Sequence, residues 1–325
     1  MSGRIFQAPF VSGHDNFVLR AVTERSKKAA AGHYPSIISY NTVEELLSDP
    51  AIELVIVNTP GNTHVDLARQ ALLAKKHVLI EKPAARTVEQ VKQLYDLARQ
   101  QGRHCMVYQN RRWDSDFLAV KQMIESGQLG DLIEVNFRYD RYKPELSPKK
   151  FKEDAKAGTN GLVYDLGPHL IDQAISLFGR PLSYHKVTAT HRDNSEVIDY
   201  FSFHLAYPNQ LNVFLTSGLL IAQPLPSFTI HGKLGSFIKQ RCDVQEEQLD
   251  AGMKPADPAY GLEPAGCEGV LILPDIDGKK TTRPVASCKG SYTHLFDAVY
   301  HTIRHNALYP ITEEHIAWQV ELLEA

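Results

Sequence analysis

Three short apolar runs in the first third of the chain alternate with longer stretches that have a helical pattern. The runs are 54–57, 77–80 and 105–108. Continuous apolar strands of this kind are typical of parallel sheets that are covered by helices on both faces. The stretches between them, 62–75 and 87–101, are long enough for the helices that connect parallel strands. The alternation predicts a doubly wound α/β sheet, in which ligands bind beyond the carboxyl ends of the strands.

The glycine-rich turn of a dinucleotide-binding fold is only partly present at the start of the chain. Such a fold opens with a strand and a Gly-x-Gly-x-x-Gly turn that leads into the first helix. This chain opens with Met1-Ser2-Gly3, so Gly3, followed by Arg4 and Ile5, matches only the last glycine of the turn and the helix after it. We therefore expect a doubly wound sheet whose first, central strand is missing, and we expect that the sequence is a shortened one.

A further apolar run, 17–22, is predicted to be the second strand of this sheet. It is followed by Glu24, Arg25 and Ser26, at the place where the adenosine ribose of a dinucleotide would lie. Glu24 could accept hydrogen bonds from both ribose hydroxyls and favour NAD, whereas Arg25, Ser26 and Lys27 could hold a 2′-phosphate and favour NADP. The alternative is an ordinary charged loop that faces solvent. The basic residues incline the prediction towards NADP.

The pattern changes after residue 112. Helices are predicted over 113–126, 292–305 and 313–324, and short polar turns join the strand-like runs between them, which is typical of an antiparallel sheet. These runs are 132–142, 184–190, 200–206, 211–216, 227–231 and 236–239. We predict two domains, a nucleotide-binding domain over 1–112 and a substrate-binding and oligomerisation α/β domain over 113–325 with an open, mainly antiparallel sheet.

The composition of the 325 residues argues against several classes of function. The formal net charge is −3 with both signs interspersed, so we expect no binding to nucleic acid or to membrane surfaces. No apolar run approaches the ~20 residues of a membrane span, and the start of the chain lacks the apolar core of a signal peptide. The four cysteines lie far apart, and His301 and His305 have no cluster of other ligands nearby, so no metal is expected. A cytoplasmic protein is predicted.

Two segments carry the polar groups that an alcohol oxidation needs. Hydride transfer from an alcohol carbon to a nicotinamide requires a base for the hydroxyl proton and a donor that stabilises the developing alkoxide. Lys82, between Glu81 and Pro83 at the end of an apolar run, is the candidate donor, and His169 is the candidate base. Asp165 is expected one turn before His169, opening the same helix, where it can orient the imidazole or bind a substrate hydroxyl. Taken separately, Asp165 could be a plain N-cap and His169 a surface histidine.

Several motifs make the sequence resemble the Gfo/Idh/MocA oxidoreductases over nearly the whole chain. They are EKP at 81–83, YQNRRWDSDF at 108–117, RYKPE at 141–145, GLVYDLGPHLID at 161–172 and HGKLGSFIK at 231–239. The resemblance is greatest to the branch with the NADP-dependent scyllo-inositol dehydrogenases. It implies a Rossmann domain, NAD(P)-dependent oxidation or reduction of a polyol or sugar, and a homodimer or homotetramer formed through the C-terminal sheet.

The resemblance also implies roles for individual residues. Lys82 would help bind cofactor and substrate, Asp165 would bind or polarise the substrate, and His169 would act as acid and base. The loop that flanks the cofactor and the neighbouring cleft would be formed by Asn58, Thr59, Pro60, Asn62, His64, Glu81 and Asn110. Together with the N-terminal residues and the loop after the second strand, these complete the predicted NADP or NAD site.

Two alternatives remain open at this level. A non-catalytic dinucleotide-sensing or interaction protein could be built on the same fold; the missing glycines favour it, whereas the intact set of Lys82, Asp165 and His169 argues against it. Arg111 and Arg112 could contact substrate or phosphate, but an ion pair at the domain boundary would explain them equally well.

Overall fold

Parallel strands form the first part of the fold, as the alternation in the sequence predicts. The computed structural model describes residues 3–24, 26 and 28–324. Within these residues, β3, β4 and β5 pair in parallel, and β1 and β2 pair in parallel as a separate two-stranded sheet. The order, with a gap between β1 and β3, is that of a doubly wound sheet without its central first strand. The strands are Ala21–Thr23 (β1), Ile38–Tyr40 (β2), Leu54–Val57 (β3), His77–Glu81 (β4) and Cys105–Tyr108 (β5).

The helices of this part begin and end at the residues that the sequence signals indicate. The Thr42 hydroxyl accepts the N–H of Glu45 at the start of α2, and the Thr87 hydroxyl accepts the N–H of Gln90 at the start of α4. Gly102, with φ at 63°, ends α4 in the left-handed conformation that favours glycine. The helical segments are η1 (Gly3–Gln7, a π-helix), α1 (Ala8–Gly13), η2 (Ala30–Gly32), α2 (Val43–Ser48), η3 (Gly61–Thr63), α3 (His64–Leu73) and α4 (Val88–Gln101).

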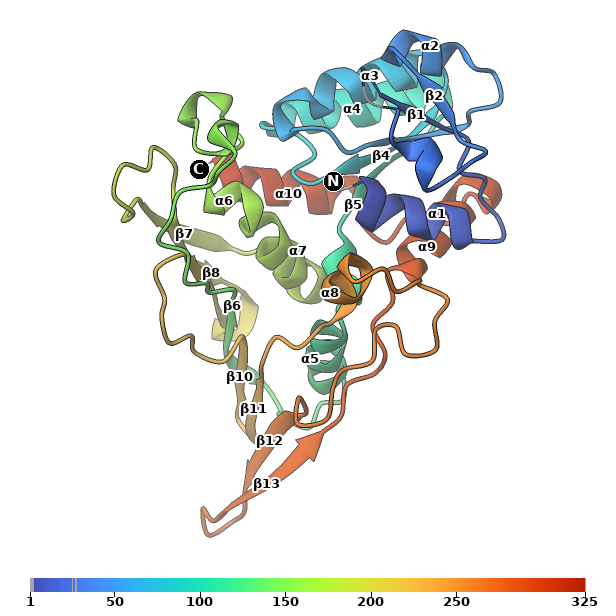
Figure 1. The fold of residues 1–325 in the computed structure, drawn as a ribbon. Coiled ribbons are helices and arrows are strands. Elements are labelled where there is room, and N and C mark those ends of the chain that lie inside the picture. Colours follow the sequence, from blue (N-terminus) through green and yellow to red (C-terminus); the bar gives the residue numbers. More distant parts are fainter. Residues whose placement is uncertain (1–2, 25, 27, 325) are drawn as a thin grey trace.

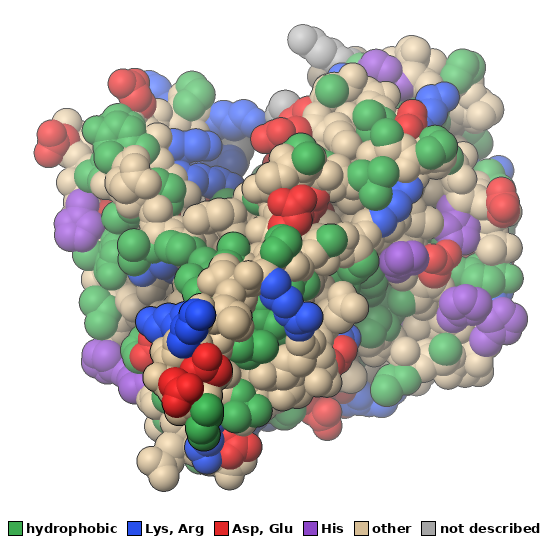
Figure 2. Space-filling model, turned by 90° about the horizontal axis from the view of Figure 1, so that it is seen from below, with side chains coloured by type: hydrophobic (Ala, Val, Ile, Leu, Met, Phe, Trp, Pro, Cys, Tyr) green, Lys and Arg blue, Asp and Glu red, His purple; other side chains and the backbone are tan. Residues whose placement is uncertain are grey.

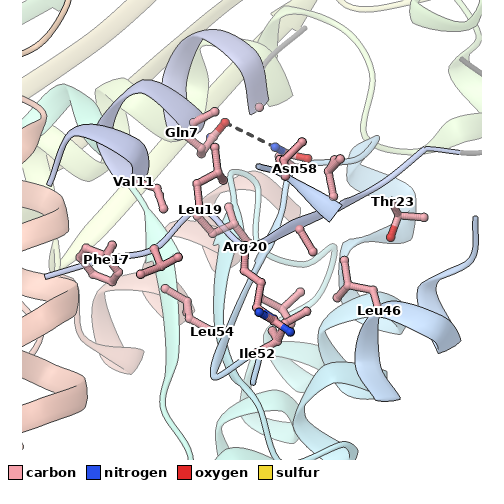
Figure 3. A pocket seen from close by; sticks show the side chains of 18 of the residues that line it. Gln7, Val11, Phe17, Leu19, Arg20, Thr23, Leu46, Ile52, Leu54 and Asn58 are labelled. Carbon is pink, nitrogen blue, oxygen red and sulfur yellow. Dashed lines mark hydrogen bonds between the residues drawn. The ribbon is translucent and has the colours of Figure 1, made fainter. Parts of the chain in front are cut away.

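A cavity of about 950 Å³ occupies the gap between β1 and β3. Its walls are mostly apolar, and Figure 3 shows Val11, Leu19 and Leu54 around it. The strand predicted over 17–22 is shorter than expected, because β1 begins only at Ala21. No strand lies beside the segment before Ala21 on its β3 side among the described residues, and Leu19 packs against the hydrophobic core instead.

A mainly antiparallel sheet dominates the second part, as predicted, and it has eight strands, of which β12 and β13 were not among the predicted runs. Its order is β13-β12-β11-β10-β6-β9-β8-β7, and β6 and β9 are its one parallel pair among the described residues. The first strand ends at Arg138, although the pattern predicted a strand as far as Tyr142. The strands are Leu132–Arg138 (β6), Ser183–Ala189 (β7), Tyr200–Ala206 (β8), Asn212–Gly218 (β9), Phe228–Gly232 (β10), Gly235–Lys239 (β11), Gly269–Pro274 (β12) and Lys280–Val285 (β13).

Helices α5 and α7 cover one face of this sheet, and their apolar side chains join those of the strands in one core. The predicted helix over 113–126 is confirmed as α5, preceded by a short 3-10 turn. The remaining helical segments are η4 (Asn110–Trp113), α5 (Ser115–Glu125), η5 (Lys150–Lys152), η6 (Ala155–Ala157), α6 (Leu162–Asp165), α7 (Gly167–Phe178), η7 (Pro208–Gln210), α8 (Gln245–Asp250), α9 (Thr293–His305) and α10 (Glu313–Glu324).

The last two helices lie against the parallel strands rather than apart from them. Figure 1 shows α9 beside α1, and Phe296 of α9 stacks on Phe10 of α1 with ring centroids 5.4 Å apart. Helix α10 packs on both α4 and α7, so it bridges the two parts of the molecule. The domain boundary at residues 112/113 stays a prediction. No helix in the described part of the chain is long and apolar enough to cross a membrane.

Candidate functional site

Lys82 connects the end of a parallel strand to the second part of the chain. It follows β4 directly and joins Pro83 through a cis peptide bond. Its Nζ donates to the backbone carbonyl of Asp165 at 2.6 Å and to the Asp165 Oδ1 at 3.4 Å. The lysine and carboxylate that the sequence singled out are therefore brought together across 83 positions of chain.

Asp165 does not open the helix that carries His169, as was expected; it ends the short helix α6, and α7 begins at Gly167. The break is local. Pro168 has no N–H, and the N–H of His169 donates to the carbonyl of Leu166 at 3.2 Å rather than to that of Asp165. The Asp165 carbonyl thus has no partner from the next helical turn and accepts the Lys82 ammonium instead. The alternative, that Asp165 is a plain N-cap, is therefore wrong, because the position before α7 is Leu166.

His169 is buried at the start of α7, with 6% of its surface exposed. Its Nδ1 has no hydrogen-bond partner among the described residues. Burial lowers the pKa of the imidazole well below its usual range, and four cations lower it further: Lys82, Arg111, Arg241 and Arg141. At neutral pH the ring is therefore uncharged, which is the form that accepts a proton.

Asp165 remains ionised among cations. Its carboxylate loses part of its hydration, which raises its pKa, but Lys82, Arg141 and Lys152 outweigh this effect and the pKa is lowered overall. The Oδ2 atom lies 3.8 Å from Arg141 Nη1. About half of the Asp165 side chain, 52%, is exposed to solvent, so the carboxylate can accept a substrate hydroxyl while it holds both cations.

The predicted phosphate-binding residue Gly3 lies against the loop after β3. A Cβ at this position would stand 2.4 Å from Asn58 Nδ2, so any larger residue requires the Asn58 side chain to move. Gln7 connects this contact to the end of β4, because its side chain accepts from Asn58 Nδ2 at 3.4 Å and donates to Glu81 Oε1 at 2.6 Å (Figure 3). The close approach of the backbone at Gly3 fits the requirement of a dinucleotide pyrophosphate.

The large cavity reaches the predicted cofactor residues at its polar end. Its lining includes Gly3, Arg4, Glu24, Asn58 and Thr59 but not Lys82, Asp165 or His169. The cavity itself is thus the apolar gap in the sheet, and its edge adjoins the place where a dinucleotide would bind. The residues present at that edge fit an NADP or NAD molecule.

The other predicted cofactor residues fall into two groups. Thr59, Pro60 and Asn62 are exposed after β3, with the Thr59 and Thr63 hydroxyls 2.7 Å apart. Three residues are buried: Ile5 lies in the core, Asn110 lies in η4, and His64 has one ring nitrogen 2.8 Å from the Pro83 carbonyl and the other 2.8 Å from the Thr59 carbonyl. His64 therefore ties the loops after β3 and β4 together rather than facing a ligand.

Glu24 is occupied by its own loop. Its carboxylate accepts the backbone N–H groups of Ala29 and Ala30 at 3.0 and 3.2 Å and the Ser39 hydroxyl at 2.6 Å. The hydrogen bond from Ser39 is the main reason why the pKa of Glu24 is lowered. Ser26 is exposed nearby, and Arg25 and Lys27 lie outside the described residues.

Sequence reasoning missed three residues that surround the catalytic candidates. The Tyr139 ring follows β6, and the guanidinium carbons of Arg241 and Arg141 lie 4.2 and 4.8 Å from its centroid. Arg141 is the first residue of the RYKPE motif, and Arg241 lies two residues after the HGKLGSFIK motif. Proximity to these motifs was the one signal in the sequence that could have indicated the two arginines. Arg111 and Arg112 do form ion pairs, with Asp114 and Asp172.

Comparison with known proteins bears on this geometry. The family model described as "Oxidoreductase family, NAD-binding Rossmann fold" matches residues 2–109, and that of the GFO/IDH/MocA C-terminal domain matches residues 117–238. An uncharacterized oxidoreductase of Schizosaccharomyces pombe, C115.03, is 38% identical over 100% of this chain and 93% of its own length. The scyllo-inositol 2-dehydrogenase (NADP(+)) IolW of Bacillus subtilis is 35% identical over 100% of this chain and 90% of its own.

A solved structure resembles the whole fold. The putative oxidoreductase yvaA from Bacillus subtilis is 34% identical and superposes with a TM-score of 0.92, over 99% of this chain and 92% of that chain. The arrangement of a parallel sheet followed by a large mixed sheet is therefore shared along the entire chain.

Proposed function

The chain belongs to the Gfo/Idh/MocA family of NAD-binding oxidoreductases, and we propose that it oxidises or reduces a polyol or sugar, with an inositol-like ring as the first candidate. It is an NAD(P)-dependent enzyme that acts on CH–OH groups. The substrate proposal draws on the relative that is named a scyllo-inositol dehydrogenase. The observation that carries it is the contact between Lys82 Nζ and Asp165 beside the buried His169.

In this proposal each polar group has one task in moving the proton. The uncharged His169 accepts the proton of the substrate hydroxyl, while the Lys82 ammonium donates a hydrogen bond to the oxygen as it gains negative charge. Asp165 holds the lysine in place and accepts a hydrogen bond from a neighbouring hydroxyl. The carbon loses a hydride, and the bound NADP or NAD supplies the acceptor for it. The products are a ketone or lactone, the reduced nicotinamide and one proton.

NADP is the cofactor that we propose. Glu24, the residue that would select NAD, already accepts three hydrogen bonds from Ala29, Ala30 and Ser39 and so has little capacity left for ribose hydroxyls. The relative IolW is named as NADP-dependent. Gly3, Asn58 and Gln7 would bind the pyrophosphate side of the molecule.

The test is turnover of scyllo-inositol, myo-inositol and common aldoses with NADP⁺ and with NAD⁺, followed by the absorbance of the reduced nicotinamide. We expect His169→Asn to lower kcat by about 10²–10⁴ and to leave the affinity for NADPH, measured by calorimetry, unchanged. His305→Asn at the exposed end of α9 is the matched control. Tight binding of NADPH without turnover of any compound would instead favour a dinucleotide-sensing protein on this fold.

The assembly and location that the sequence predicts remain part of the proposal. One face of the eight-stranded sheet is not covered by the helical core, and it carries stacked rings of His204 and Phe214, 4.6 Å apart, and a Val187 that is 45% exposed. Such a face is suited to pair with a second copy in a homodimer or homotetramer. Sedimentation that shows a monomer would contradict this, and the cytoplasmic location is a further expectation.

A further inference from the structure

Three guanidinium groups gather around one aromatic ring next to the proposed catalytic residues. The centroid of Tyr139 lies 5.2 Å from the Cζ of Arg111, 4.8 Å from that of Arg141 and 4.2 Å from that of Arg241. All three cations act on the pKa of His169. Like charges at such distances repel, so the cluster requires negative charge nearby. A cation of this cluster that has no counter-ion within the protein would need one from the substrate.

Arg111 and Arg241 have counter-ions inside the protein. Arg111 donates to Asp114 at 3.2 Å and to Glu246 at 2.9 Å, and Arg241 lies 3.6 Å from Asp114 and 3.8 Å from Asp116. Both arginine side chains are largely buried, at 11% and 12% exposed. Arg111 is thus held by hydrogen bonds within the protein, whereas the guanidinium nitrogens of Arg241 lie near two carboxylates but have no hydrogen-bond partner among the described residues.

Arg141 is different. Its side chain is 28% exposed, and its one ion pair among the described residues is with Asp165 at 3.8 Å, beyond hydrogen-bond distance. The same carboxylate lies 3.4 Å from Lys82 Nζ, and the exposed Lys152 also lowers its pKa. Three cations therefore share one carboxylate on the side where a substrate would bind. Figure 2 shows Lys and Arg side chains gathered around a hollow on one face of the molecule.

The backbone holds Arg141 in a defined position. Its N–H donates to the carbonyl of Gly218 at 2.9 Å, and its own carbonyl accepts the N–H of Ile221 at 3.1 Å. The ring beneath its guanidinium is fixed too, because the N–H of Tyr139 donates to Thr216 and the Tyr139 carbonyl accepts the Ser217 hydroxyl. A guanidinium that is stacked and held in this way loses little freedom when its N–H groups bind an anion.

We propose that the substrate carries an anionic group, a carboxylate or a phosphate, and that Arg141 binds this group. The inference rests on the proposed function, because it places the group on the molecule whose hydroxyl meets Lys82 and His169. A guanidinium binds both kinds of anion through two parallel hydrogen bonds. The bound anion supplies the negative charge that Lys82, Arg141 and Lys152 lack. Within the polyols and sugars of the proposed function, the inference favours a sugar acid or a sugar phosphate over a neutral compound such as scyllo-inositol, which leaves the charge uncompensated.

The test compares matched compounds on the full chain. D-Glucose, D-glucuronate and D-glucose 6-phosphate differ in the group at one carbon, and myo-inositol is a second neutral probe. We expect an anionic compound to exceed glucose in kcat/KM by about tenfold or more, with a difference that narrows as salt is added. Arg141→Gln removes most of this difference, and Arg180→Gln, which breaks an exposed pair with Glu321, keeps it. Glucuronate and glucose 6-phosphate separate the two sources of the anion.

Calorimetry with the same four compounds distinguishes this inference from the proposed function. If glucuronate or glucose 6-phosphate binds more tightly than glucose, and Arg141→Gln abolishes the difference, the anion site is supported even when no compound is oxidised. The absence of turnover would then contradict only the proposed oxidation of these sugars. If glucose and myo-inositol bind as tightly as the anions, or if Arg141→Gln weakens all four equally, the anion site is refuted.

Discussion

His169 shows how single residues set the chemistry of this site. The imidazole is buried, its Nδ1 has no hydrogen-bond partner among the described residues, and four cations act on it. Both effects favour the uncharged ring, because burial and positive neighbours each destabilise an imidazolium. The histidine is thus prepared to take a proton from a hydroxyl, and it returns that proton readily.

The depressed pKa of His169 predicts the pH dependence of the oxidation. The uncharged form is the active one, so kcat/KM is expected to stay level as the pH falls through ~6.5, the usual value for histidine, and to decrease only at lower pH. Removal of a cation by Arg141→Gln raises this pKa and moves the acidic limb towards neutral pH. The measurement is the pH profile of kcat/KM for both enzymes. An acidic limb at or above ~6.5 in the unaltered enzyme would contradict the account.

Some of the residues at this site can be predicted from the sequence, and others cannot, for a physical reason. Lys82, Asp165 and His169 each lie in a motif, and two of them stand four positions apart, so local spacing is enough to select them. Arg141 and Arg241 come from segments 100 positions apart. The pairing of β10 with both β6 and β11 brings these segments together. Long-range pairing of this kind leaves no local signature.

At the scale of elements, a buried ion pair ties the helix that carries His169 to the short helical turn η4. Arg112 in η4 donates to both carboxylate oxygens of Asp172 in α7, at 2.8 and 2.7 Å, and to the carbonyl of Pro310 at 2.7 Å. The two charged side chains are 10% and 4% exposed. One arginine thus connects η4, α7 and the segment before α10.

Removal of this carboxylate is expected to destabilise the fold. Asp172→Asn leaves the buried Arg112 without its counter-ion, and the loss of one partner from a buried pair costs about 3–5 kcal/mol. The matched control is Glu321→Gln, which breaks the exposed pair with Arg180 and should cost less than about 1 kcal/mol. Thermal and urea denaturation of the three proteins compares these costs. Equal shifts for both variants would show that Asp172 contributes no more than a surface charge.

Element boundaries could be predicted where the signal was local, and not elsewhere. The caps Thr42, Thr87 and Gly102 act within their own helices, so neighbouring residues alone are enough to indicate them. The run 17–22 gave only the short strand β1, because a parallel strand depends on neighbours on both sides and no strand pairs with β1 on its β3 side among the described residues. At the break between α6 and α7, which Pro168 causes, the freed Asp165 carbonyl accepts Lys82, and this contact with a residue distant in sequence has no local signal.

At the scale of the whole molecule, a gap between β1 and β3 divides the parallel strands into two separate sheets. Among the described residues β3 pairs with β4 alone and β1 with β2 alone, so each strand has one edge without a strand partner. The cavity at this gap, about 950 Å³, is lined mainly by apolar side chains, including Val22 and Ile56. Unpaired backbone groups beside a cavity cost free energy, about 1–3 kcal/mol for each group kept from water.

A strand fused to the N-terminus is expected to fill this gap and to strengthen cofactor binding. An extension of about six alternating β-branched residues, ended by Gly-x-Gly before Gly3, would pair in parallel with β1 and β3 and complete the turn that holds a pyrophosphate. Burial of each large apolar side chain stabilises the fold by about 1.5–3 kcal/mol. Ordering of each residue costs about 1–2 kcal/mol. The net stabilisation therefore comes from the buried side chains and the completed hydrogen bonds together. We expect a higher melting temperature, tighter NADPH binding and slower hydrogen exchange at Leu54 and Ile56 of β3, whose N–H groups point away from β4 and towards the gap. An extension of equal length made of glycine and serine has the same turn and the same reach but no apolar side chains to bury. If both extensions change the melting temperature and the exchange of β3 equally, the cavity is not a site for a strand.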